Sequence, residues 1–339
     1  MNDTRKNKMA YFAGIIDGDG SFSLCKKTAV GERSPLYYPL IQLSTTNDRM
    51  IERLKNEFGG FVSSRKPYRG KDNSLRKASK SWKLERRNKC EPFLNEITDH
   101  LIVKKERAQY LSQYLSENPF VRGSVCVPSE VLRRRESAYI KMRSFNTEHP
   151  PLNFIFPKRR KMSDDPYFWN YFAGLMDTDG SFSIKREKSG YYCPVILLTM
   201  IDHRAFEYLL KNCSLGRVIQ VAAKTSRNGL CYRLGLYKLA DCLSFLSIII
   251  PYLDIKKEQA TILYDYCKER SGSSKITIER SDFWYEKLRS CNNGVYKSSL
   301  MDLKPLPGKA GGNKAQAAKA CSVNVASGKT PLKDGDAVL

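Results

Sequence analysis

The sequence is poor in histidine, short of acidic residues relative to basic ones, and free of long apolar runs. Only three histidines occur among the 339 residues, at positions 100, 149 and 203, so a nuclease built around a His–metal site is not expected. The apolar run from Leu243 to Ile250 ends at Pro251, far short of the roughly 18 residues that a membrane span requires. Met1–Met9 lacks the apolar stretch of a secretory signal. We therefore expect an intracellular protein without a membrane partner.

The cysteines lack the spacing of a metal site. The chain contains ten of them, and none lies two to four residues from another, which argues against structural zinc. Together with the missing secretory signal, this favours free thiols in a reducing compartment.

The charge balance indicates the partner. Lys and Arg number 58 against 35 Asp and Glu, which leaves a net charge of +23. Such an excess favours nucleic acid as the partner, with an anionic membrane surface as the weaker alternative. Charge alone does not distinguish DNA from RNA.

The chain repeats itself. Tyr11–Ser23 and Tyr171–Ser183 are identical at ten of thirteen positions, with an offset of 160 residues. This period is too long for a solenoid and indicates duplicated domains. Weaker matches follow in the same order; they pair Tyr38–Ile41 with Cys193–Ile196, Phe58-Gly59 with Leu215-Gly216, Trp82–Leu84 with Tyr232–Leu234, and Leu101–Ala108 with Leu253–Ala260.

Each copy is predicted to form a helix, two strands, a helix, two strands and a final amphipathic helix. The predicted domains are residues 8–115 and 166–270. Residues 116–165 form a basic linker with one short helix around Ser129–Met142. Residues 271–339 form a C-terminal extension, and its composition predicts disorder from about residue 304.

Alternation within the first strand of each copy predicts which side chains face the helices. Phe22 and Leu24, like Phe182 and Ile184 in the second copy, are expected to point inward. The outward positions of this and the other strands are Ser23, Cys25, Lys27, Gln42, Arg65 and Lys83 in the first copy, and Ser183, Lys185, Glu187, Leu197, Ile219 and Arg233 in the second.

The repeated motif has the features of a helix interface that ends in a reactive site. Ala13-Gly14 and Ala173-Gly174 allow two helix backbones to approach closely. Gly20 and Gly180 then permit the turn from helix to strand. If the two helices pack through this face, Asp19 and Asp179 meet at the centre of the molecule.

Two carboxylates at negative helix ends repel each other unless a cation lies between them. Mg²⁺ suits such oxygen ligands and also binds substrate phosphate. The carbonyl groups of Gly18 and Thr178 could add ligands. Lys104 and Lys256 are expected at the rim of the site, as catalytic groups that polarise water or the leaving oxygen, with solvated helix-start charges as the alternative. Asp17 and Asp177 are interpreted as structural acceptors at the helix ends.

At these residues the chain resembles the LAGLIDADG homing endonucleases that carry two motifs in one chain. The motif corresponds to Phe12–Gly20 and Phe172–Gly180. The resemblance implies an α+β fold of two pseudo-symmetric αββαββα domains. A central two-helix interface joins them, and their antiparallel, saddle-shaped sheets bind the major groove of double-stranded DNA.

The resemblance also implies the chemistry. Asp19 and Asp179 would bind divalent metal, Mg²⁺ with Mn²⁺ or Ca²⁺ as substitutes in binding, and each would cut one strand to leave short 3′ overhangs. The basic residue of the family near the third helix corresponds to Lys104 and Lys256. A polar residue after the second strand often holds the water, and here Thr45 and Met200 occupy that position. Methionine cannot hold this nucleophilic water, so either neighbouring polar groups or ordered water substitute for it, or one strand is cut more slowly. The outward strand positions are also more polar in the first copy than in the second, so we expect unequal half-sites, with the second half relying more on apolar contacts and DNA shape.

Two other functions remain open on the same scaffold: an RNA-binding maturase acting on its own intron, and a non-cleaving DNA-binding regulator. Intact aspartates in both motifs favour cleavage. The family's frequent origin in organelle introns is compatible with a chloroplast or mitochondrion, but the sequence itself indicates no more than an intracellular protein. Because both halves of the site lie in one chain, we expect a monomer.

Overall fold

The fold was determined from a computed structural model, which describes residues 2–27, 34–69, 75–118, 127–145, 162–222, 230–272 and 276–293. The predicted disorder beyond about residue 304 lies outside the described residues.

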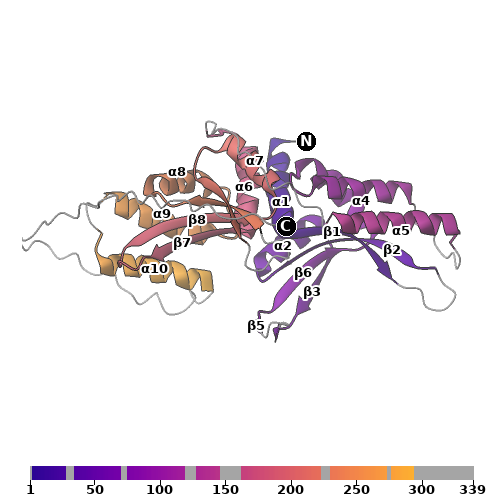
Figure 1. Ribbon diagram of the computed structural model, residues 1–339, viewed down its shortest axis with the longest axis horizontal. Helices are drawn as coiled ribbons and strands as arrows, with labels where there is room; N and C mark the ends of the chain where they lie inside the picture. The colour runs from indigo at the N-terminus through magenta and orange to yellow at the C-terminus, as the bar shows by residue number, and fades with distance from the viewer. Residues whose placement is uncertain are drawn as a thin grey trace, which may run out of the picture. The chain divides into compact units, whose positions relative to one another are not determined.

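The first copy begins with the long helix α1 (Asp3–Asp19), which Asn2 caps through its side chain. Two strands follow, β1 (Gly20–Lys27) and β2 (Leu36–Thr45), and then helix α2 (Asp48–Phe58). Strands β3 (Phe61–Arg65) and β6 (Ser79–Leu84) complete a four-stranded antiparallel sheet in the order β1-β2-β6-β3. A small hairpin of β4 (Tyr68–Arg69) and β5 (Leu75–Arg76) lies beyond β3 and β6 (Figure 1). Helices α3 (Arg87–Ile97) and α4 (Lys105–Glu117) end the copy, with a short 3₁₀ turn at Thr98–His100 between them.

The second copy repeats this order. Its elements are α6 (Pro166–Thr178), β7 (Gly180–Arg186), β8 (Tyr192–Met200), α7 (His203–Asn212), β9 (Arg217–Ala222), β10 (Leu230–Leu236), α8 (Leu239–Ile249) and α9 (Lys257–Gly272). The sheet order β7-β8-β10-β9 is the same as in the first copy. The predicted α+β class and the two antiparallel sheets are therefore confirmed. Each copy has one helix more than predicted, α3 or α8, which lies between the last strand of the sheet and the final helix.

The strand pairing corrects the alignment of the two copies. Trp82 opposes Leu43 on β2, whereas Leu234 opposes Leu198, the residue on β8 that matches Leu43. Trp82 therefore corresponds to Leu234, and the pairing of Trp82–Leu84 with Tyr232–Leu234 was wrong by two residues. The slip leaves the inward and outward faces unchanged, because side chains alternate with a period of two.

The glycine before the third strand of each copy, β3 or β9, supports this corrected alignment. Gly60 and Gly216 both have positive φ, at 92° and 80°. A Cβ on Gly60 would lie 2.7 Å from the carbonyl oxygen of Lys83, and one on Gly216 would lie 3.2 Å from that of Gly235. The counterpart of Gly216 is thus Gly60, one residue after the predicted Gly59, and the counterpart of Lys83 is Gly235.

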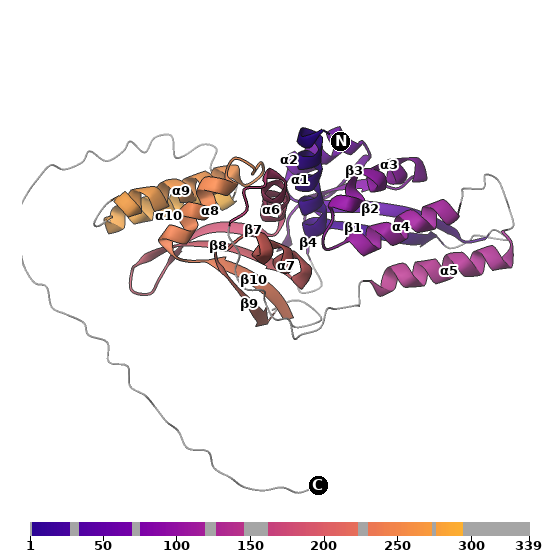
Figure 2. The ribbon, with the colours of Figure 1, turned by 90° about the horizontal axis from the view of Figure 1, so that it is seen from above.

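Helices α5 (Ser129–Ser144) and α10 (Ile278–Asn293) play equivalent parts in the two copies. The predicted helix in the linker exists, and it packs on β1 and α4 instead of spanning between domains, while α10 packs on β7 and α9 (Figure 2). Glu136 of α5 binds Tyr37 and Lys26. Asp282 of α10 likewise accepts a hydrogen bond from Tyr192. Each helix is therefore attached to its sheet by an acid at an equivalent position.

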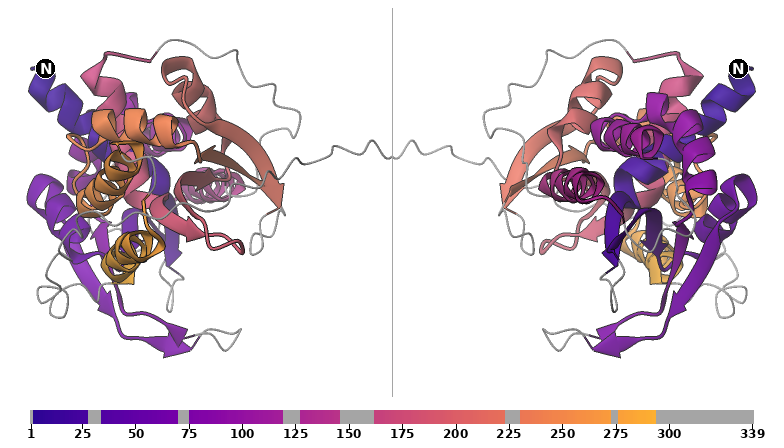
Figure 3. Two further views of the ribbon diagram at one scale, coloured as in Figure 1. Left: turned by 90° about the vertical axis from the view of Figure 1, so that its left-hand side faces the viewer. Right: turned by 90° about the vertical axis from the view of Figure 1, so that its right-hand side faces the viewer.

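The inner face of each sheet is the core. Phe22, Leu24, Phe182 and Ile184 are buried as predicted. In the first copy Trp82 lies in an aromatic cluster with Phe58 and Phe93. Phe58 of this cluster also contacts Phe12 on α1, and in the second copy Phe172 on α6 contacts Phe245 on α8. The end-on views in Figure 3 show the N-terminal end of α1 projecting beyond the other helices and strands.

Candidate active site

Helices α1 and α6 pack against each other at the backbone. A Cβ on Gly14 would lie 2.1 Å from the carbonyl oxygen of Tyr171, and a Cβ on Gly174 would lie 2.1 Å from that of Tyr11. Glycine is required at both positions because only a hydrogen fits there. The close approach continues to the helix ends, where a Cβ on Gly18 would lie 2.1 Å from Oγ1 of Thr178. The predicted small-residue interface is confirmed.

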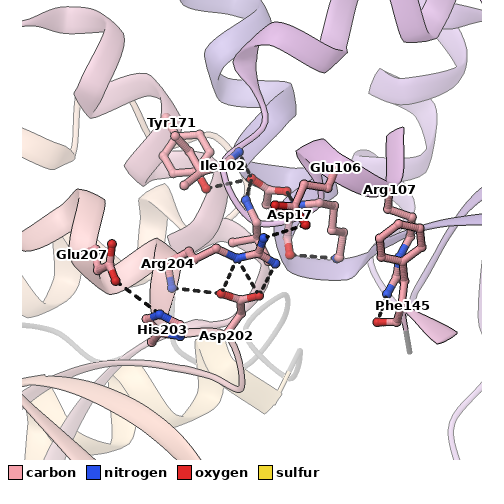
Figure 4. Close-up of polar contacts among 12 residues, drawn as sticks. Asp17, Ile102, Glu106, Arg107, Phe145, Tyr171, Asp202, His203, Arg204 and Glu207 are labelled. Atoms are coloured by element: carbon pink, nitrogen blue, oxygen red, sulfur yellow. Dashed lines mark hydrogen bonds and ion pairs between the residues drawn. The ribbon is translucent and has the colours of Figure 1, made fainter. Parts of the chain in front are cut away.

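Asp17 and Asp177 lie in equivalent buried nests, with exposed fractions of 1% and 2%. Asp17 accepts hydrogen bonds from the backbone N–H groups of Ile102, Val103 and Lys104, at 2.8, 3.0 and 2.8 Å (Figure 4). These N–H groups precede helix α4 and have no partner within it, so the carboxylate satisfies the start of that helix. Burial raises the pKa of Asp17, against the lowering effect of Lys104 and the three N–H groups.

Asp177 makes the same contacts in the second copy, with Asp254, Ile255 and Lys256 as donors at 2.9, 3.1 and 2.8 Å. The interpretation of both acids as structural acceptors is confirmed. The prediction did not identify the donors, which are the backbone N–H groups just before helices α4 and α9, far along the chain.

Two buried tyrosines link the copies. The hydroxyl of Tyr171 donates to Asp17 at 2.8 Å, and the hydroxyl of Tyr11 donates to Asp177 at 2.7 Å. The sequence analysis did not select these residues. Their signal was present, since both occupy the first position of the repeated segment.

Lys104 and Lys256 lie at the C-terminal ends of the paired helices, nearer to the backbone than the predicted rim position. The Lys104 ammonium donates to the carbonyl oxygens of Ile16, Asp17 and Gly18 at 2.8, 2.7 and 2.9 Å. A cation there is stabilised by the negative end of the helix. Burial nevertheless lowers the pKa of Lys104 to about 8.

The Lys256 ammonium occupies the equivalent position, with the carbonyl oxygens of Met176, Thr178 and Gly180 at 3.1, 2.7 and 2.6 Å. Burial lowers its pKa too. The carbonyls of Gly18 and Thr178, predicted as exposed metal ligands, therefore already accept a hydrogen bond each from a lysine. A carbonyl oxygen has two lone pairs, so a role as metal ligand stays compatible with this contact and stays a prediction.

Asp19 and Asp179 follow directly at the ends of α1 and α6. Each residue is exposed overall, but its carboxylate is buried enough to shift the pKa. A Cβ on Gly18 would lie 3.3 Å from Oδ2 of Asp179, which places this carboxylate beside the opposite helix. Burial and the neighbouring charge of Asp19 raise the pKa of Asp179 to about 6. Burial also raises the pKa of Asp19.

The two acids fit a divalent cation. Burial raises the pKa of both carboxyl groups, the charge of Asp19 adds to the rise at Asp179, and a cation beside them would favour the ionised forms. Within the described residues, no group of three or more His, Cys, Asp or Glu side chains could hold a metal ion on its own. A cation bound here would therefore draw further ligands from carbonyl groups, water or a substrate phosphate, which is the ligand set that Mg²⁺ accepts.

The positions predicted to hold water differ between the copies. Thr45 ends β2, and its hydroxyl accepts a hydrogen bond from the backbone N–H of Asn47 at 3.2 Å. Met200 ends β8 and is buried. The role of Thr45 stays a prediction, and the thioether of Met200 has neither the polarity nor the exposure to take it.

The outer face of the first sheet is polar. Ser23 and Cys25 are half-buried next to the exposed Lys27 on β1, and Arg65 is exposed on β3. Ser21, Gln42, Lys83 and Phe61 form one row across the four strands. Phe61 is 59% exposed and was not selected from the sequence.

The outer face of the second sheet is more apolar. Leu197 and Ile219 are half-buried on it, and Arg233 donates to Oγ1 of Thr199 at 3.2 Å. Lys185 and Glu187 form an ion pair at 2.9 Å. The predicted difference between the two outer faces is thus present in the structure. A contact of these residues with DNA stays a prediction.

Solved structures share this architecture. I-GzeII, described as a LAGLIDADG homing endonuclease in complex with its DNA target, aligns with a TM-score of 0.62 and 14% identity over 85% of this chain and 99% of its own. The meganuclease I-SmaMI bound to DNA gives 0.59 and 18% over 85% and 98%. The LAGLIDADG meganuclease I-AabMI bound to uncleaved DNA gives 0.59 and 14% over 82% and 98%. The chain has the fold of the LAGLIDADG homing endonucleases.

Among curated proteins, a probable intron-encoded endonuclease, aI3 of Dictyostelium discoideum, is 24% identical over 247 residues, which cover 72% of this chain and 88% of that protein. No family model matches the chain. In the described part of the chain, no helix is long and apolar enough to cross a membrane.

Proposed function

We propose that this chain is a site-specific DNA endonuclease of the LAGLIDADG homing type that cuts both strands of a duplex. The observation that supports this most is the duplicated centre. Two aspartates end two helices in backbone contact, and each helix end is fixed by a lysine with three carbonyl acceptors. A duplicated centre suits a duplex, whose two strands each offer one phosphodiester.

In this proposal Asp19 and Asp179 bind Mg²⁺, with the carbonyls of Gly18 and Thr178 as further ligands. The bound ion would stabilise charge on the phosphate and lower the pKa of the attacking water. Lys104 and Lys256 hold the helix ends and place a positive charge beside the reacting phosphates. Their pKa values are lowered, so each can lose its proton more easily than an ordinary lysine.

The outer faces of the two sheets bind the major groove, where base edges are distinguishable. We infer that the polar first face reads its half-site through hydrogen bonds from Gln42, Arg65 and Lys83. The second face, with Leu197 and Ile219, relies more on apolar contacts and on DNA shape. Cleavage leaves short 3′ overhangs and promotes the mobility of a host intron. The name of the Dictyostelium relative, a probable intron-encoded endonuclease, supports the link to an intron. The protein acts as a monomer, in an organelle if its gene lies in an organelle intron.

The test is cleavage of a randomised duplex library and of the uninterrupted form of the host gene, with Mg²⁺ or with EDTA. We expect one Mg²⁺-dependent double-strand break at a single site. Asp99→Asn serves as a control, because the Asp99 side chain is 90% exposed and its ion pair, with Lys105 at 3.7 Å, is a surface contact. Binding of the DNA without cleavage under any divalent metal would refute the nuclease and leave the regulator. Binding of the intron RNA in place of DNA would favour the maturase.

A further inference from the structure

The two tyrosine hydroxyls cross the boundary between the copies. Tyr171 belongs to α6 in the second copy but donates to Asp17 in the first. Tyr11 belongs to α1 in the first copy but donates to Asp177 in the second. Both rings are buried, with exposed fractions of 0% and 5%. Each hydroxyl thus donates a hydrogen bond to a buried carboxylate of the other copy.

Each carboxylate connects the tyrosine to the reacting end of a helix. Asp17 holds the N–H groups of Ile102–Lys104. The ammonium of Lys104 in turn holds the carbonyls of the last turn of α1, directly before Asp19. An equivalent chain of contacts runs from Tyr11 through Asp177 and Lys256 to the end of α6, directly before Asp179.

We propose that Tyr171 is a positioning residue for the Asp19 half of the centre and Tyr11 for the Asp179 half, so that each copy of the repeat holds the other's catalytic end in place. The proposal rests on the proposed function for its cleavage readout. It concerns the hydroxyl groups alone, since phenylalanine would fill the same buried space.

The two links are not equally reinforced. The loop at Asp254 is held by a second contact from the first copy, because Asp254 pairs with Arg49 at 2.5 Å and with Arg53 at 2.8 Å. The equivalent position in the first copy is Ile102, which carries no charge; the first copy has instead a single longer pair, between Glu106 on α4 and Arg204 of the second copy, at 3.6 Å. Removal of the Tyr171 hydroxyl should therefore have the larger effect.

The first arm of the test needs neither metal nor DNA. Hydrogen exchange of the backbone amides is measured in EDTA for the wild type, Tyr171→Phe and Tyr11→Phe. A hydrogen bond to a charged group contributes enough that its loss should raise exchange at Ile102–Lys104 by roughly tenfold in Tyr171→Phe. Exchange at Asp254–Lys256 should stay unchanged in that variant. Tyr11→Phe should give the reverse pattern with a smaller factor.

The second arm compares the strands. Under saturating DNA, Tyr171→Phe should slow cleavage of the strand that Asp19→Asn leaves intact, by roughly tenfold, with DNA affinity unchanged. Tyr11→Phe should slow the other strand. Equal acceleration of exchange at both loops, equal slowing of both strands, or no change in either variant would overturn the proposal. If the wild type does not cut DNA, the proposed function fails, while the exchange arm still decides this inference.

Discussion

The packing of α1 against α6 predicts a large effect for a single methyl group. In Gly14→Ala the new Cβ would lie 2.1 Å from the Tyr171 carbonyl oxygen, 2.9 Å from the Leu175 nitrogen and 3.0 Å from the Gly174 Cα. All three atoms are backbone, so no side chain can turn away. The helices must separate by about 1 Å to restore ordinary contact distances.

That separation strains more than the contact itself. Overpacking in a rigid core costs about 1–3 kcal/mol. The same shift stretches the hydrogen bonds between Tyr171 and Asp17 and between Tyr11 and Asp177, and each bond to a charged group contributes about 1.5–3 kcal/mol. We expect a loss of about 3–5 kcal/mol in the free energy of unfolding, and a fall in Tm of roughly 10 °C.

The assay is thermal and urea unfolding followed by circular dichroism. Gly272→Ala is the matched control, because a Cβ there would meet nothing within 4 Å and no positive φ is recorded for Gly272. The control should unfold within about 0.5 kcal/mol of the wild type. A Gly14→Ala protein as stable as Gly272→Ala would refute the backbone contact between the helices.

Three further predictions concern charge. The pKa of Asp179 is raised from 3.8 to about 6, so the folded protein binds more protons than the unfolded chain between these two pH values. Stability in EDTA should therefore fall as the pH rises through that window. In Asp179→Asn the Tm should depend less on pH over the same window, and an unchanged dependence would contradict the raised pKa of Asp179. Asp17→Asn replaces a carboxylate that accepts four hydrogen bonds and should destabilise the protein by about 3 kcal/mol in urea unfolding, whereas the exposed Asp99→Asn should change nothing measurable. Lys83→Ala on the outer face should weaken binding of the target site by about 1–3 kcal/mol and relax the base preference at the position that Lys83 reads; Lys89→Ala on α3 should leave both affinity and base preference unaltered, and equal effects of the two variants would argue against DNA binding on that face.

The sequence predicted the fold and the position of the centre well, because the signals were strong and duplicated. The repeated segment located α1, α6 and the acids at their ends. Alternation in β1 and β7 separated the buried Phe22 and Phe182 from the outer face. Side chains repeat every two residues on a strand face and every 3.6 residues on a helix face, and both patterns can be recognised in the sequence without knowledge of distant contacts.

What the sequence could not supply depends on contacts between distant segments. The alignment of β6 with β10 was wrong by two residues, because Trp82–Leu84 and Tyr232–Leu234 both contain an aromatic residue, a basic residue and a leucine in the same order. The lysines were placed at the rim, because nothing in the local sequence of Lys104 indicates three carbonyl acceptors 86 to 88 positions away. The tyrosines were missed for the same reason: their partners, Asp17 and Asp177, lie 154 and 166 residues from them.

The most direct test of the central claim is strand-specific nicking by single-aspartate variants. A duplex carrying the target is labelled on both strands and incubated with Mg²⁺ and with wild type, Asp19→Asn, Asp179→Asn or the double variant. We predict that the wild type cuts both strands and that each single variant still cuts one strand, a different one in each variant. The double variant should bind the duplex but cut neither strand. If the double variant still cut both strands, the account would be contradicted, because the reacting centre would then lie elsewhere.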